Sequence, residues 1–114
     1  MYAFEVQTYL GFRYAGYGTT LETCRERRGA ELVHETSTQA TNPERFPFYR
    51  TTVLSRCAPA TLAEGGYGWA VEADGAWGAV MPSAALCDAM RETLAPSVPA
   101  DRLGPCRPVT LTRQ

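Results

Sequence analysis

The chain has 114 residues, of which 45% are hydrophobic and 20% are charged, a composition typical of one globular domain and not of a disordered chain. Its formal net charge of −1 argues against a general attraction to nucleic acid or to an anionic membrane. No apolar run reaches the ~18 residues of a membrane span, and the N-terminal residues do not resemble a signal peptide. We therefore expect one compact cytoplasmic domain over residues 1–114.

The first dozen residues alternate with a period of two, which predicts a half-buried strand. One parity carries most of the aromatic and aliphatic side chains, and the other carries Glu5, Gln7 and Arg13. We expect Gly11 to bend or bulge this strand. The sequence AGYG at residues 15–18 then predicts a turn that ends it.

Residues 19–38 are compatible with two structures. Thr19 and Glu22 have the spacing of a capping box, which predicts a short helix over about 20–28 that ends at Gly29. The alternative is a hairpin of residues 21–26 and 31–37. In both cases we expect residues 31–38, ELVHETST, to form a strand.

The middle of the chain predicts a loop followed by a strand and a connection. Two prolines place a loop at residues 41–47. Residues 48–57, FYRTTVLSRC, are rich in aromatic and β-branched side chains and predict a strand. Residues 58–66 are expected to connect this strand to the next element.

Residues 67–81 predict a hairpin whose turn contains the Asp-Gly pair at residues 74–75. A two-residue loop would place Trp69 and Trp77 on opposite faces of the sheet. A three-residue loop, in which Glu72 pairs with Ala76, would place both on one face. We favour the second register, with the two side by side under the next helix, because burying a Trp contributes a few kcal/mol.

The C-terminal third predicts a helix, an irregular arm and a short strand. Ser83 opens a helix of about residues 83–94 with one apolar stripe, and Pro96 ends it. Residues 95–108 form a proline-rich arm, and VTLT at residues 109–112 predicts an edge strand. The expected class is α+β: one antiparallel sheet of four to six strands with the helix of 83–94 on one face, joined there by a short second helix of about 20–28 where that segment is helical and not a hairpin.

The four cysteines, Cys24, Cys57, Cys87 and Cys106, are scattered and contain no CxxC pair. Such spacing does not favour a metal site, and nothing else in the sequence indicates a cofactor. For a cytoplasmic protein we expect four reduced thiols. If one pair is bridged, Cys87 and Cys106 are favoured, because their bond would fix the proline-rich arm to the preceding helix.

A catalytic function would depend on the single histidine, His34. Cys24 is the nearest cysteine in sequence, so the alternative of a small enzyme uses Cys24 or a carboxylate with His34. No local sequence signature supports this pair. The residue pattern favours a solvated or hydrogen-bonded His34, and we expect a protein that is not an enzyme.

The RERR sequence at residues 25–28 is the only basic cluster. It supports a second alternative, an arginine-mediated nucleic-acid-binding protein, which nearby tyrosines would assist by stacking. Neighbouring glutamates dilute the positive charge, and no nucleic-acid-binding motif is present. We therefore do not expect nucleic acid as a partner, and we expect the cluster to be a solvated face with ion pairs.

Recognition of another protein is the function that the sequence favours. Tyr, Trp and Arg dominate interface hot spots, and Arg13, Tyr14 and Tyr17 lie beside the predicted glycine-rich turn. The candidate partner-binding residues are these three together with Arg25, Arg27 and Arg28. From its small size and the lack of catalytic motifs, we expect a protein-binding module such as an inhibitor, an immunity protein or a mobile-element anti-defence protein. A homodimer is also compatible.

Overall fold

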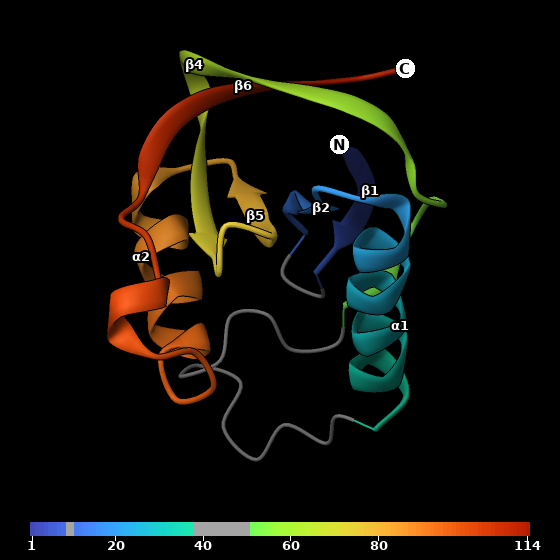
Figure 1. Cartoon of the computed structure of the whole chain (residues 1–114). Coiled ribbons are helices and arrows are strands. Elements are labelled where there is room, and N and C mark those ends of the chain that lie inside the picture. Colours follow the sequence, from blue (N-terminus) through green and yellow to red (C-terminus); the bar gives the residue numbers. More distant parts are fainter. Residues whose placement is uncertain (9–10, 38–50) are drawn as a thin grey trace.

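Six strands and two helices build an α+β domain in the part of the chain that the structure describes, residues 1–8, 11–37 and 51–114 of a computed structural model. The strands form one antiparallel sheet, and both helices pack on one of its faces (Figure 1). The predicted class is thus confirmed. The elements are β1 (Tyr2–Gln7), β2 (Arg13–Gly18), α1 (Leu21–Ser37), β3 (Thr52–Val53), β4 (Ala58–Ala73), β5 (Trp77–Met81), α2 (Ala84–Leu94), the 3₁₀ turn η1 (Ala100–Arg102) and β6 (Arg107–Arg113).

The sheet curls over itself because β4 is long and bent. The strand order is β3-β1-β2-β5-β4-β6, and the first residues of β4 also pair with β1, Tyr2 opposite Pro59. β4 changes direction at Gly65 and Gly66, both at positive φ, and its pairing with β6 shifts there. Residues 58–68 of β4 and 109–113 of β6 therefore form a two-stranded ribbon, here called the arch, which crosses over the sheet (Figure 1).

Each face of the sheet has its own apolar core. The face under the helices carries Phe4, Val6, Val71 and Met81, packed with residues of both helices such as Cys24, Cys87 and Met90. The face under the arch carries a smaller cluster, built from Met1, Ala3, Tyr17, Ala60, Leu62, Val80 and Leu111. The arch therefore buries the apolar side chains of one face of the sheet, and the helices bury those of the other face.

The predicted first strand is two strands. β1 and β2 form an antiparallel hairpin, in which the backbone turns through Gly11 at φ +96° and Thr8 N donates to Phe12 O. The pairing places Val6 opposite Tyr14. Because the paired residues have the same parity, the alternation continues through the reversal and conceals it. Residues 15–18, expected as a turn, belong to β2.

The ambiguous segment is a helix of 17 residues. Residues 31–37 continue the helix and do not form the predicted strand, and Gly29 does not end it. The N-cap is Thr20, whose Oγ1 accepts from Thr23 N at 3.1 Å, and not Thr19. Tertiary packing on β2 and β3 extends α1 beyond what its weak apolar face predicts.

The middle of the chain differs from the prediction. The loop of 41–47 and the start of the strand of 48–57 lie outside the described residues, and the described remainder of that strand contains only β3. The connection expected at residues 58–66 is instead the first half of β4. Its small and polar residues have low strand propensity, so the sequence did not predict a strand here. The segment is a strand because it pairs with β1 and β6.

The hairpin of β4 and β5 has the predicted faces but a different register. Trp69 and Trp77 lie on the face under the helices, as predicted. However, Ala73 pairs with Trp77, so the three-residue loop is 74–76 and not 73–75. Its first two residues both have positive φ, of 56° and 62°, as in a type I′ turn.

The two tryptophans are not side by side. Trp69 pairs with Met81 at one end of the hairpin, and Trp77 pairs with Ala73 at the other. The Val71–Ala79 pair lies between them. Each Trp therefore contacts a different part of the core.

Two disulfides connect the helices to the rest of the fold. Cys87 bonds Cys106, the pair favoured from the sequence, and Cys24 bonds Cys57, which was not anticipated. The expectation of four reduced thiols is wrong for this structure. α2 begins after the predicted Ser83 cap, whose Oγ accepts from Leu86 N at 3.1 Å.

The arm of residues 95–108 is fixed to α2 by more than its disulfide. Val98 and Leu103 are buried, and Arg91 Nε of α2 donates to Gly104 O at 3.0 Å. Within the described residues β6 pairs only with β4, so it is the predicted edge strand, extended to seven residues.

Candidate functional site

The predicted partner-binding tyrosines are core residues. Tyr14 is 5% exposed, and its hydroxyl donates to Glu31 Oε1 at 3.2 Å. Tyr17 is 1% exposed, and its hydroxyl donates to Glu72 Oε1 at 3.1 Å. Burial first, and the neighbouring carboxylate second, raise the pKa of both phenols well above the usual value. The sequence suggested that a turn displays these side chains, whereas in the structure both lie in β2 and are buried.

Two of the three arginines of the basic cluster have structural contacts. Arg27 stacks over the ring of Trp77, with Cζ 3.7 Å from the ring centroid, and burial lowers the pKa of its guanidinium. Arg28 Nε donates to Ser55 O at 2.8 Å, which connects α1 to the segment after β3. Of these three arginines, only Arg25 is exposed.

The predicted catalytic pair is not available as proposed. Cys24 is 0% exposed and its sulfur is bonded to Cys57, so it offers no thiolate nucleophile in this state. His34 lies in α1 and not on a strand, and its side chain is outside the described residues. Over the described part of the chain, no group of three or more His, Cys, Asp or Glu side chains is placed to hold a metal ion.

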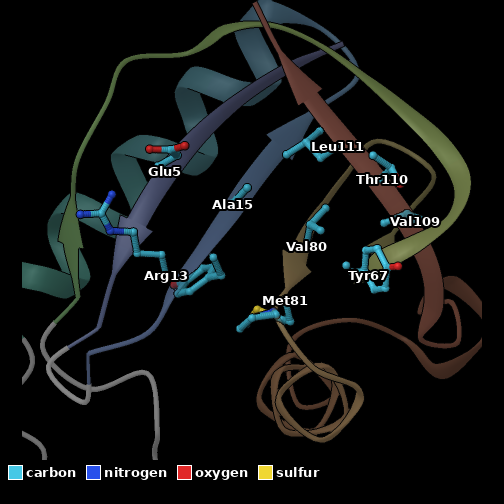
Figure 2. Close-up of a pocket in the computed structure, with 12 residues that line it drawn as sticks. Glu5, Arg13, Ala15, Tyr67, Val80, Met81, Val109, Thr110 and Leu111 are labelled. Atoms are coloured by element: carbon cyan, nitrogen blue, oxygen red, sulfur yellow. The ribbon is translucent and has the colours of Figure 1, made fainter.

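A groove with a volume of about 370 Å³ lies between the arch and the sheet. This volume is within the range of ordinary ligand sites. Figure 2 shows Ala15 and Val80 on the sheet side, Leu111 and Val109 on β6, and Glu5 and Arg13 on one flank. The groove is lined by Glu5, Arg13, Tyr14, Ala15, Tyr67, Gly68, Val80, Met81, Pro82, Val109, Thr110 and Leu111.

The groove follows from the distribution of side-chain sizes on β2. Tyr17 fills one end of the space under the arch, together with Ala3 and Ala60. Two residues earlier on the same face, Ala15 leaves the other end hollow. The mouth is reached at Arg13, where β2 begins.

Tyr67 lies at the bend of the arch and is 97% exposed. The bend is held in shape by Thr110 Oγ1, which donates to Gly65 O at 2.8 Å, and by the ion pair of Arg107 and Glu64. At Gly66 a Cβ would come within 2.8 Å of Val109 O, so the close approach of β6 requires glycine there. A defined backbone therefore presents an aromatic side chain to solvent.

Sequence reasoning missed Tyr67 because the EGGYG stretch was interpreted as a flexible connection. The signal was the pair of glycines, because glycine within a strand often marks a bulge, and a bulge can redirect a side chain. Arg13, by contrast, was predicted and is exposed at the mouth of the groove.

Comparisons with family models, with curated proteins and with solved structures found no match to this chain. The described residues contain no helix of the length and apolar character that crossing a membrane requires.

Proposed function

We propose that this protein is a non-enzymatic module that binds another protein by docking a segment of it in the groove under the arch. One observation carries the proposal: Tyr67, a large aromatic side chain that is almost fully exposed, lies at the edge of the apolar groove. Tyrosine is enriched among binding hot spots, and hot spots are found in and around pockets. An inhibitor or immunity protein remains the class that we favour.

The two alternative functions have less support. The Cys24–Cys57 bond removes the only thiol that was considered as a nucleophile. Arg27 and Arg28 are engaged with Trp77 and Ser55, which leaves little of the basic cluster for nucleic acid.

The two disulfides also bear on the compartment. Disulfides persist mainly in oxidising surroundings. They weigh against the cytoplasmic location expected from the sequence, and we propose an extracytoplasmic or otherwise oxidising environment.

Partner capture with matched variants tests the proposal. Disulfide-bonded protein is immobilised, exposed to extracts of the source cells, and compared with Tyr67→Ala and with Tyr67→Phe. We expect a retained protein whose affinity, measured afterwards with purified partner, falls about thirtyfold for Tyr67→Ala, as for a hot-spot residue. Tyr67→Phe should keep most of the affinity because it keeps the ring.

Arg102→Ala is the control, because Arg102 is exposed at the opposite end of the sheet, paired with Asp74. A partner that binds wild type and Tyr67→Ala equally would contradict docking at the groove. The same holds if Ala15→Leu, which fills the hollow, leaves binding unchanged.

A further inference from the structure

We infer that the groove recognises a peptide segment carrying a large apolar side chain next to an acidic residue, whose carboxylate binds Arg13. This inference rests on the proposed function and adds the chemistry of the partner. It is drawn from three features of the groove: its charges, its apolar walls and the exposure of its rim.

Among the described residues, one cation at the groove has no counter-ion. The carboxylate of Glu5 is 3.1 Å from Arg113 Nη1, so its charge is compensated within the protein. Glu64 and Arg107, at the bend of the arch, likewise compensate each other. Arg13 differs, because its one hydrogen bond among the described residues is from Nε to the neutral Gln7 Oε1 at 3.1 Å.

The guanidinium of Arg13 therefore presents its Nη groups with no acceptor among the described residues. A guanidinium fork matches a carboxylate in geometry and charge, and such charge-assisted bonds are the stronger ones. The flank of the groove is thus complementary to an anion.

The walls next to Arg13 are complementary to an apolar group. Ala15, Val80 and Leu111 line the hollow within reach of the same flank (Figure 2). Burying an apolar side chain against them removes its surface from water. An occupant that satisfies both features has an apolar group and a carboxylate close together.

The exposure of the rim favours a peptide over a small molecule. Tyr67 is 97% exposed at the far side of the groove from Arg13, so an occupant confined to the hollow would leave its ring uncovered. A peptide chain that continues out of the groove would cover it. Nucleic acid fits less well, because its repeated phosphates need several uncompensated cations and the lining offers only Arg13.

Titration with short peptides tests the inference on the full, disulfide-bonded protein. The probes are acetylated, amidated peptides with Leu-Glu or Phe-Glu between glycines, each matched with the Gln version. Amide chemical shifts in two-dimensional NMR spectra report millimolar binding and its location. We expect shifts at the groove and an affinity about tenfold or more higher for the Glu peptides.

Arg13→Ala should reduce the affinity for the Glu peptide to that for the Gln peptide, and should leave Gln-peptide binding unchanged. Arg102→Ala, the matched control, should alter neither. Higher ionic strength should weaken only the Glu peptides. The spectra themselves show whether each variant is folded.

Three outcomes would overturn the inference. Equal binding of Glu and Gln peptides at the groove would remove the acidic preference but leave the proposed function standing. The absence of shifts with every probe would also reject it, and capture with the Tyr67 variants would still decide the proposed function separately. Equal, Arg13-dependent binding of a free aromatic carboxylate such as benzoate would identify a small-molecule site instead.

Discussion

Two phenols of β2 each donate a hydrogen bond to a carboxylate from another element. Tyr14 reaches Glu31 of α1, and Tyr17 reaches Glu72 of β4. Thr51 Oγ1 also donates to Glu31, at 3.3 Å from Oε2. At the scale of single residues, these bonds let polar atoms lie under the helices and under the arch without the cost of an unpaired buried group.

The raised pKa values of Tyr14 and Tyr17 predict a loss of stability at alkaline pH. In the unfolded chain each phenol loses its proton near pH 10, whereas the folded protein retains it to higher pH. Above pH 10 the unfolded state therefore binds fewer protons, and the free energy of unfolding falls by up to about 1.4 kcal/mol per pH unit for each phenol. Below pH 10 these groups cause no change.

Urea unfolding between pH 8 and about pH 12 measures this dependence. Tyr17→Phe removes one titrating group, so its free energy of unfolding should fall less steeply with pH than that of wild type. Parallel slopes for the two proteins, or ionisation of Tyr17 in the folded protein near pH 10, would contradict the assignment.

At the scale of elements, α1 is positioned by close backbone contact with β2. A Cβ at Gly18 would collide with the backbone nitrogen of Cys24, whereas a Cβ at Gly29, within the same helix, would meet nothing within 4 Å. The two glycines thus have opposite roles, one permitting the helix to approach and the other only weakening it.

Alanine at these two positions should have opposite effects on stability. Gly18→Ala should lower the free energy of unfolding by about 2 kcal/mol, because the helix must move away from the strand. Gly29→Ala should raise it by about 0.5–1 kcal/mol through helix propensity. Urea denaturation of both variants measures the difference, and a stable Gly18→Ala protein would show that α1 does not pack on β2 this closely.

The two disulfides also hold the elements together. Cys24–Cys57 and Cys87–Cys106 span 33 and 19 residues. The chain-entropy model assigns about 4 and about 3 kcal/mol of stability to loops of these lengths. Replacing both cysteines of one bond with alanine should lower the free energy of unfolding by a comparable amount, measured by urea denaturation.

Mass analysis of unreduced protein treated with iodoacetamide provides the direct check. We expect no alkylated cysteine before reduction and four afterwards, because the structure contains no free cysteine. Four alkylated thiols in unreduced, folded protein would refute both bonds.

At the scale of the whole molecule, the pairing of β4 with β1 joins the N-terminal strand to the middle of the chain, and the arch covers the face that the helices leave open. The core under the helices includes residues of both helices and four strands. These contacts join elements from both ends of the described chain, which is the arrangement expected of one folding unit.

We therefore predict a single cooperative unfolding transition. Trp69 and Trp77 contact opposite ends of the helix-side core, so tryptophan fluorescence and far-ultraviolet circular dichroism should give coincident urea curves. Two separated transitions would contradict the predicted single domain over residues 1–114.

The sequence by itself determined the features that depend on local pattern. The hairpin at residues 74–75, the shared face of Trp69 and Trp77, the Ser83 cap and the C-terminal edge strand follow from turn chemistry, alternation and capping. Of the candidate site, Arg13 alone among the predicted residues lies at the groove and is exposed.

Only the tertiary structure decided the rest, because those features depend on contacts between distant segments. Residues 58–66 are a strand because β1 and β6 pair with them. Tyr14 and Tyr17 are buried because the helix-side core and the arch-side cluster enclose them, and Glu31 and Glu72 accept their hydroxyl hydrogen bonds. Neither fact has a local signature. The groove likewise exists because a bend at two glycines carries the arch over an alanine, and this juxtaposition arises only when the sheet closes on itself.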